Sequence, residues 1–418
     1  MAAPARGVAK ILAKSPADVV LLAAVRTPIT RAYRGQLKDA YPEELLACVL
    51  RHVRERAAPG VDLGPHIDDV GVGVVLSELG GSKAARMAMN HVGYPSSTAL
   101  YTINRACASS LAAVAAVAAQ IRTGAVSVGV AAGMESMTRN YGGRAVPGDA
   151  WPAAAASPVR DARDCLMPMG LTSENVAERY GVSREHQDAF AAESHVRAAA
   201  ARGGGLFDGE IVPVATRFRE PDGPGAERAV TVARDDGIRD PISLEALARL
   251  EPAFKPGGRS TAGNSSQVSD GAAAALLTSR ATAERLGLSR LVMAKFVSAV
   301  AVGCAPDEMG VGPALAIPKL LAAHGLAVGD VDRWEINEAF ASQALHCLRE
   351  LRLEDAWAAG RVNPTGGAIA LGHPLGATGA RMTSTLVHGM RRDGHDLGVV
   401  SMCIGTGMGM AALFAREA

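Results

Sequence analysis

The sequence predicts a layered α/β protein built from two similar units, and two observations support this prediction. Strand-like apolar runs alternate with helix-like segments from Asp18 to Ala132, and the same alternation returns between Asp332 and Phe414. In addition, Thr102-Ile-Asn104 and Arg361-Val-Asn363 each lead into a turn of small residues, which indicates weak internal symmetry. We therefore expect a duplicated α/β unit whose reactive groups lie at strand-to-helix turns.

The first unit has a regular alternation of strands and helices. Glu43 and Glu44 stand where a helix would begin, and acidic residues stabilise the amino-terminal end of a helix dipole. The segment that begins at Ser109 is almost wholly apolar and strongly helical, so we expect a deeply buried helix there. The expected strands are 18–25, 70–76, 100–103 and 126–132, and the expected helices are 42–56, 84–91 and 109–123.

The second unit repeats this order after a long intervening segment. Its expected strands are 332–336, 397–402 and 408–414, and its expected helices are 342–351 and 379–392. Residues 139–270 contain glycine- and proline-rich stretches and two polar helices, at 172–180 and 185–202, which favours a lid or specificity element. The predicted division is a flexible leader at 1–17, a first half at 18–138, an inserted loop domain at 139–270 that returns to the first half, and a second half at 271–418.

Composition excludes several classes of protein. The chain has 418 residues, 48% of them apolar and 20% charged, which is typical of globular proteins rather than disordered ones. A net charge of +1 gives no reason to expect a nucleic-acid partner, and the longest apolar run, Leu111 to Ala119, is too short to span a membrane. The six cysteines include no Cys-x-x-Cys pair, so we expect neither a metal site nor a disulfide scaffold. Cys48 and Cys347 follow apolar helical patterns and are expected in the core, whereas His186 and His195 are expected to be solvated.

Two cysteines and a histidine lie in three separate turns of small residues. Cys107 precedes a helix, where free backbone N–H groups favour a thiolate and can hold an oxyanion. His373 lies in a turn with many glycines and is the candidate base for Cys107. Cys403 ends a strand, so we expect its thiol to be exposed at the sheet edge and the N–H of Gly405 to be free to donate. A second thiol is useful where a proton moves at a carbon beside a thioester. Asn337 could orient a water or a carbonyl oxygen, although a turn-capping role is the alternative.

Longer motifs around these residues resemble those of the thiolase family, most closely the peroxisomal-type 3-ketoacyl-CoA thiolases. The resemblance covers the chain from about Asp18 to Phe414 and rests on these stretches: Gly133-Met-Glu-Ser-Met137, the stretch from Ala162 to Arg179, Ser260-Thr-Ala-Gly-Asn-Ser-Ser-Gln-Val-Ser-Asp-Gly271, Glu335-Ile-Asn-Glu-Ala-Phe-Ala341, Asn363-Pro-Thr-Gly-Gly367 and Ser401-Met-Cys-Ile-Gly-Thr-Gly407. The family implies a five-layered αβαβα fold and CoA-dependent cleavage of 3-ketoacyl-CoA in fatty-acid β-oxidation. It also implies coenzyme A as a co-substrate with no permanently bound cofactor, and a homodimer or a tetramer.

The resemblance also implies roles for single residues. Cys107 would carry the acyl group after activation by His373, and Cys403 would exchange the α-carbon proton of acetyl-CoA. One oxyanion hole would use the N–H groups of Cys107 and Gly405, and the other would use His373 with a water held by Asn337. Ser266 and Met169 match a CoA-contacting serine and a position that lines the pantetheine tunnel. Peroxisomal localisation is expected from the family resemblance alone. The chain ends in Ala-Arg-Glu-Ala418 rather than Ser-Lys-Leu, and its basic leader fits no clear peroxisomal signal.

One departure from the family leaves alternatives open. The family usually reads Cys-Ser-Ser-Gly at the nucleophile, whereas this chain has Cys107-Ala-Ser-Ser110. Ser110 restricts the backbone, is expected to place a hydroxyl close to the oxyanion hole, and could alter the rate or the acyl-chain preference. A biosynthetic, acetoacetyl-CoA-forming thiolase and a ketosynthase-like condensing enzyme are the alternative enzymes. Condensing enzymes of that type lack a second catalytic cysteine, so Cys403 favours a thiolase. A lipid-binding or assembly subunit with degenerate chemistry is the non-enzyme alternative.

Overall fold

Two sheets with the same strand order face each other in the computed structural model, which describes residues 7–55, 57, 60–141, 145–220 and 227–417. In the first half the strands run in the order β1-β8-β5-β3-β4, and in the second half in the order β9-β12-β11-β10. The two sheets are continuous only where Val19–Leu21 of β1 pairs with Ala294–Phe296 of β9. The strands of the two halves are β1 (Val19–Arg26), β3 (Asp69–Gly73), β4 (Ala99–Ile103), β5 (Val128–Ser136), β8 (Ser269–Ser279), β9 (Ala294–Gly303), β10 (Arg333–Ile336), β11 (Leu397–Ile404) and β12 (Met408–Arg416), with the short β2 (Thr30–Arg31) paired to β8.

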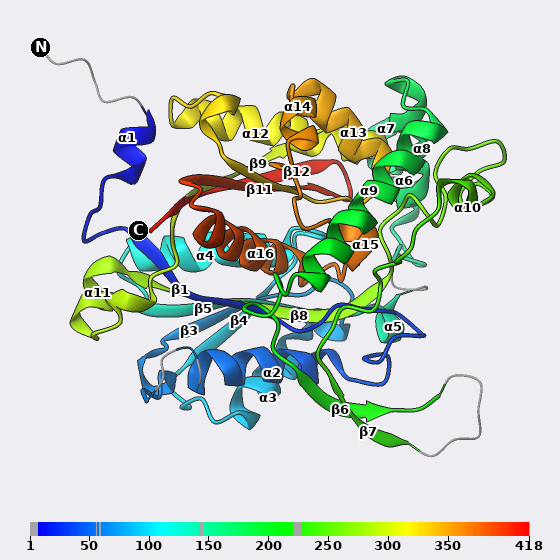
Figure 1. Cartoon of the computed structure of the whole chain (residues 1–418). Coiled ribbons are helices and arrows are strands. Elements are labelled where there is room, and N and C mark those ends of the chain that lie inside the picture. The colour runs from blue at the N-terminus through cyan, green and yellow to red at the C-terminus, as the bar shows by residue number, and fades with distance from the viewer. Residues whose placement is uncertain (1–6, 56, 58–59, 142–144, 221–226, 418) are drawn as a thin grey trace, which may run out of the picture.

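Helices fill the space between the sheets and cover their outer faces (Figure 1). The middle layer contains α4 (Ser109–Arg122) and α16 (Thr378–Asp393), which pack on each other and on strands of both sheets. One outer layer is α2 (Pro42–Glu55) with α3 (Ser82–His91), and the opposite one is α12 (Gly312–Ala323) with α13 (Ala341–Glu350). The result is the expected five-layered αβαβα arrangement.

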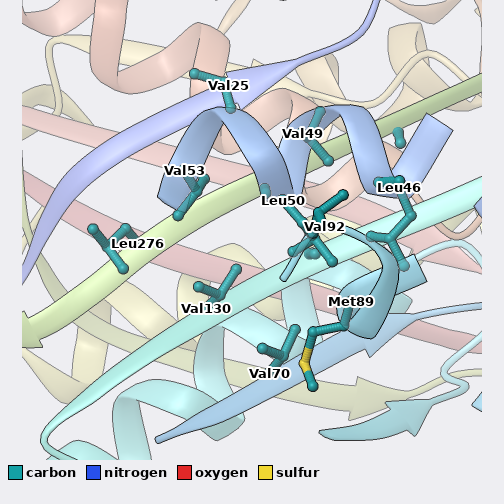
Figure 2. Close-up of a cluster of buried hydrophobic side chains, with 14 of the residues drawn as sticks. Val25, Leu46, Val49, Leu50, Val53, Val70, Met89, Val92, Val130 and Leu276 are labelled. Atoms are coloured by element: carbon teal, nitrogen blue, oxygen red, sulfur yellow. The ribbon is translucent and has the colours of Figure 1, made fainter. Parts of the chain in front are cut away.

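The burial of each helix follows from its layer. Outer helix α2 buries one stripe, which includes Leu46, Val49, Leu50 and Val53, against the first sheet, and Figure 2 shows these side chains meeting Val70, Val130 and Leu276 of the strands. Middle helix α4 has apolar side chains all round because a sheet or another helix lies on almost every side of it. The almost wholly apolar sequence of α4 is therefore explained by its position in the middle layer.

The inserted segment lies between β5 and β8, and it contains more helix than strand. Its elements are α5 (Met137–Asn140), α6 (Pro152–Ala155), α7 (Arg160–Asp164), α8 (Met169–Arg179), α9 (Arg184–Gly203), α10 (Leu244–Ala248) and the hairpin of β6 (Val214–Phe218) with β7 (Arg228–Val232). Helices α11 (Arg280–Arg285), α14 (Glu354–Ala358) and α15 (Ala368–Leu371) connect other elements. The two polar helices expected from the sequence correspond to α8 and α9.

The predicted boundary between the halves at residue 270 is wrong. Strand β8 pairs antiparallel with both β1 and β5, so it is a central strand of the first sheet rather than the start of the second half. Its run of small apolar residues, Ala272 to Leu277, fits a strand covered on both faces. The second sheet begins with β9. The sequence analysis did not identify β6, β7, β8 or β9 as strands.

The predicted flexible leader is only partly testable, because residues 1–6 lie outside the described residues. From Gly7 onward the segment is ordered: α1 (Gly7–Leu12) buries Ile11 in the core cluster of the second half. Lys295 donates to the carbonyl of Ala13, and Arg280 donates to the carbonyl of Ser15. These contacts attach part of segment 7–17 to the body of the molecule, while most of its side chains are exposed, so the flexible leader stays a prediction.

Candidate active site

Cys107 lies in a tightly held turn between β4 and α4. Ala106, the residue before it, has a left-handed φ of 43°, which is unfavourable for alanine and needs support from its surroundings. That support comes from the Asn104 side chain, which accepts from Ala106 N at 2.9 Å, and from Ser109, whose Oγ donates to Ala106 O at 2.6 Å and accepts from Arg105 N. The strained turn places a partly buried Cys107 immediately before the first turn of α4.

The surroundings of Cys107 favour the protonated form of its thiol. Burial raises its pKa, although the backbone N–H groups of Gly405 and of Cys107 itself oppose this shift, and the nearby Glu135 adds to it. The helix start alone therefore does not produce a thiolate, contrary to the expectation from the sequence. The contact with Gly405 N–H still brings together the two backbone donors predicted for an oxyanion hole.

His373 is held by a hydrogen bond on each ring nitrogen. Its Nδ1 lies 2.6 Å from Thr378 Oγ1, and its Nε2 lies 3.4 Å from Asn337 Nδ2. Thr378 Oγ1 also lies 2.9 Å from the carbonyl of Pro374, which can only accept, so the threonine proton is used there. The arrangement that satisfies both contacts has Nδ1–H donating to Thr378, which leaves Nε2 as an unprotonated base facing Asn337.

The electrostatics of His373 favour the neutral ring. Burial lowers its pKa to about 3, and the positive charge of buried Arg381 acts in the same direction. A neutral imidazole is the state that a general base requires. Because the thiol pKa is raised and the imidazole pKa is lowered, a stable thiolate–imidazolium pair is disfavoured, and proton transfer is expected together with attack on the substrate.

Asn337 directly follows β10 and is almost fully buried. The preceding residue, Ile336, is clamped by the side chain of Asn363, which accepts from Ile336 N at 2.9 Å and donates to Ile336 O at 2.8 Å. The Oδ1 atom of Asn337 has no hydrogen-bond partner among the described residues. An unpaired buried acceptor beside His373 fits the predicted role in holding a water or polarising an oxygen better than the turn-capping alternative.

Cys403 lies near the end of β11 and is fully buried among Met309, Ala339, Phe340 and Met169. Burial raises its pKa well above that of an ordinary thiol, and neighbouring Cys107 adds to this effect. Burial therefore favours the protonated form of Cys403, which lies close to Cys107. The predicted exposure of this thiol at the sheet edge is wrong, because the apolar cluster covers it.

Gly405 and Met169 lie on the same side of the site. Gly405 begins the turn between β11 and β12, and a Cβ added to it would lie 3.2 Å from Met169 Sδ. Met169 is the first residue of α8 in the inserted segment. Residues from the insertion and from the second half thus meet beside Cys403.

Ser266 lies in an extended segment between the Asn337 and His373 turns. Its backbone N donates to Ala339 O at 3.0 Å, and the neighbouring Ser265 bridges to Phe340. The next residue, Gln267, accepts from His373 N through its carbonyl at 3.0 Å. Ser266 is partly buried and adjoins the catalytic turns, while its contact with CoA stays a prediction.

Sequence reasoning missed Glu135 and Thr378. Glu135 is fully buried at the end of β5, where its carboxylate accepts from Val75 N, Leu76 N and, in the His373 turn, Gly376 N at 3.0 Å. Burial raises its pKa to about 7. A single acid at the end of an otherwise apolar strand was the available signal. Thr378 gave no signal, since only the fold shows that its hydroxyl meets His373.

Several other predictions concern residues outside this site. His186 is exposed as expected, but His195 is buried, with Nδ1 accepting from Arg239 N at 3.0 Å, and burial lowers its pKa to about 4. Cys347 is fully buried and Cys48 partly buried, as expected of core residues. In the described part of the chain, no three His, Cys, Asp or Glu side chains are arranged to hold a metal ion, and no helix has the length and apolarity needed to cross a membrane.

Known proteins of similar sequence and similar structure identify the family of this chain. Residues 19–281 match the thiolase N-terminal domain and residues 290–416 the thiolase C-terminal domain. The rat peroxisomal 3-ketoacyl-CoA thiolase B is 51% identical over 402 residues, which cover 96% of this chain and 91% of that protein. The dimeric peroxisomal thiolase of Saccharomyces cerevisiae has a TM-score of 0.89 at 43% identity, covering 98% of this chain and 100% of that one. The human mitochondrial 3-ketoacyl-CoA thiolase, solved in complex with CoA, has a TM-score of 0.81 at 34% identity, covering 96% and 98%. The chain therefore belongs to the thiolase family.

Proposed function

We propose that this chain is an acyltransferase that cleaves 3-ketoacyl-CoA with free CoA, giving acetyl-CoA and a shortened acyl-CoA in fatty-acid β-oxidation. The relatives of about 50% identity are 3-ketoacyl-CoA thiolases. The observation that carries the proposal is that the thiols of Cys107 and Cys403 lie close together, while a neutral His373 imidazole is oriented by Thr378 and Asn337. Simple hydrolysis or acyl transfer would not require the second thiol.

In the first step, Cys107 Sγ attacks the keto carbon at C3 while His373 Nε2 accepts the thiol proton. The oxyanion that forms on the keto oxygen is stabilised by one oxyanion hole, and the hydrogen bond from Nδ1 to Thr378 stabilises the imidazolium. Collapse breaks the C2–C3 bond and leaves the acyl group on Cys107. The electron pair of that bond moves to the acetyl-CoA enolate, which Cys403 protonates.

In the second step, free CoA attacks the acyl-Cys107 thioester. The CoA thiol gives its proton to Cys403, which the first step left as a thiolate, and the CoA sulfur attacks the acyl carbon to form the new thioester. Cys107 leaves as a thiolate and takes back the proton that His373 Nε2 accepted in the first step. In this assignment the N–H groups of Cys107 and Gly405 form one oxyanion hole, and His373 with a water on Asn337 forms the other. The unpaired Oδ1 of Asn337 supports the second assignment.

Coenzyme A acts as a co-substrate in this scheme. The human mitochondrial relative has been solved in complex with CoA. We assign Ser266 and Met169 to contacts with the CoA thiol arm, because both adjoin the catalytic turns and come from the inserted segment. No step of the proposed reaction needs a permanently bound cofactor.

Three alternatives from the sequence are disfavoured. An acetyl-CoA acetyltransferase of Bacillus anthracis is 36% identical, below the 51% identity of the rat peroxisomal 3-ketoacyl-CoA thiolase B. A ketosynthase-like enzyme would not require the second thiol, Cys403. A non-catalytic lipid-binding role would not require the strained Cys107 turn or the oriented base.

The chain is assigned to the peroxisome and to a homodimer on the basis of its relatives, which include peroxisomal thiolases and a dimeric one. The outer edge of β4 supports the dimer, because this strand ends the first sheet and Leu79 and Met87 are exposed on elements that contact it. A second copy of the chain could pair there. A tetramer stays a further possibility that light scattering would distinguish.

The test is a CoA-dependent cleavage assay with 3-ketoacyl-CoA substrates from C4 to C16. We expect turnover in the wild type and a loss of at least about 10³-fold in Cys107→Ala, because no other described thiol can form the acyl-enzyme there. Cys165→Ala, at an exposed cysteine outside the site, is the matched control and should keep full activity. Cleavage by Cys107→Ala within tenfold of the wild type would overturn the proposal.

A further inference from the structure

Helix α16, which follows the His373 turn, cannot cap its own amino-terminal end. Its N-cap residue is Ala377, which has no side-chain acceptor for the free N–H groups of the first turn. Ala380 N in that turn is instead bound by Ser110 Oγ at 2.9 Å, in a fully buried contact. The acceptor comes from the other half of the molecule, 270 positions away in sequence.

This contact joins the two catalytic turns directly. Ser110 stands three residues after Cys107 in the first turn of α4, and Ala380 stands two residues after Thr378, which holds His373. The helices cross too closely here for larger groups. A Cβ added to Gly379 would overlap Leu111 N, and one added to Gly133 would lie 2.7 Å from Ser110 Cβ. Small changes at Ser110 therefore act on the separation of Cys107 and His373.

We propose that Ser110 is a positioning residue whose hydroxyl caps α16 from the opposite half and so fixes His373 relative to Cys107. The inference rests on the thiolase chemistry proposed above. It also revises the expectation that the Ser110 hydroxyl lies close to the oxyanion hole, because this hydroxyl binds the start of α16. The usual glycine of the family has no acceptor to offer at this place, so the cap belongs to the Cys-Ala-Ser-Ser sequence of this chain.

Two substitutions separate capping from size. Ser110→Ala keeps the Cβ but removes the acceptor, so the buried Ala380 N–H loses its partner without gaining space for water. Ser110→Gly removes the Cβ as well, and the opened space admits a water that can bind Ala380 N–H. If capping matters, activity should be highest with Ser at position 110, lower with Gly and lowest with Ala. If only side-chain size matters, activity should be highest with Ser, lower with Ala and lowest with Gly.

The experiment measures kcat, KM and the pH dependence of Cys107 alkylation by iodoacetamide for both variants. We expect Ser110→Ala to lower kcat about tenfold with little change in KM, and to shift alkylation to higher pH, because the misplaced base assists the thiol less. Ser110→Gly should lose only about two- to threefold.

Ser384→Ala is the matched control. Ser384 lies farther along α16, and its buried Oγ donates to Ala24 O of β1 at 2.9 Å, so it also joins α16 to the first half. This variant should lower the melting temperature by about as much as Ser110→Ala but leave kcat and the alkylation profile unchanged. Equal kinetics in Ser110→Ala and the wild type, or the order Ser, Ala, Gly, would overturn the positioning role. Absence of turnover in the wild type would instead overturn the proposed function.

Discussion

The two halves of the molecule have the same sheet register but use it for different purposes. Gly73 at the end of β3 pairs with Gly133 of β5, and Ile336 at the end of β10 pairs with Ser401 of β11. Two residues further on, Glu135 and Cys403 therefore occupy equivalent positions. Each then pairs with a glycine of the next antiparallel strand, Gly271 for Glu135 and Gly409 for Cys403.

Each of these strands ends at the catalytic turn of the other half. Glu135 accepts from Gly376 in the His373 turn, while the backbone N–H of Gly405, two residues after Cys403, lies close enough to Cys107 to lower the pKa of its thiol. The carboxylate of Glu135 has three backbone donors and so holds structure, whereas the thiol of Cys403 lies among apolar side chains and keeps its proton available. The comparison teaches that one duplicated position supplies a support on one side and an acid on the other.

The largest effect should come from Cys403→Ala. Turnover should fall about 10³-fold, because the acetyl-CoA enolate loses its proton donor, while Cys107 is still acylated. Mass spectrometry of the acyl-enzyme together with α-proton exchange of acetyl-CoA measures the two steps separately. Cys347→Ala, at another fully buried cysteine, is the control and should keep activity within about twofold of the wild type. Normal α-proton exchange in Cys403→Ala would contradict the assigned role.

A smaller effect is expected from Thr378→Val. Loss of the acceptor for Nδ1–H frees the imidazole to adopt the wrong tautomer, and kcat/KM should fall about 10- to 100-fold. Thr378→Ser should restore most of the activity. Thr383→Val is the matched control, because Thr383 makes the same hydroxyl-to-carbonyl bond on α16, to Gly379 O at 2.9 Å, without a histidine contact. If both valine variants lose activity equally, the tautomer argument fails.

The smallest effect concerns the stability contributed by Glu135. Its pKa is about 7 in the folded protein, above its ordinary value of 4.5, so its contribution is complete below pH 4.5 and is lost as the pH rises through 7. Glu135→Gln cannot ionise, and so the variant should gain stability relative to the wild type across this range, by at most about 1.4 kcal/mol per pH unit. Melting temperatures at pH 4.5 to 8 measure the difference. Glu284→Gln, at an exposed carboxylate, is the control, and its melting temperature should change with pH as that of the wild type does. The same pH dependence in Glu135→Gln and the wild type would refute this explanation.

Local pattern was enough to predict most elements near the site. The helices at 42–56 and 109–123 and the strands at 397–402 and 408–414 agree with α2, α4, β11 and β12 within one or two residues. The residues of β8 were assigned to the wrong half because a run of small apolar residues does not indicate which strands it pairs with. His195 was expected on a solvated face, yet the body of the molecule covers that part of α9.

The sequence by itself determined the fold class, the family and the set of Cys107, His373, Cys403, Asn337 and Gly405, because these residues stand in turns whose local sequence is distinctive. Only the tertiary structure shows that the pKa of both thiols is raised, since a pKa depends on burial and on charges far away in sequence. It also decided which ring nitrogen of His373 is the base. The roles of Glu135 and Ser110 arise from contacts across the two halves, and no local pattern records which distant N–H a side chain will meet.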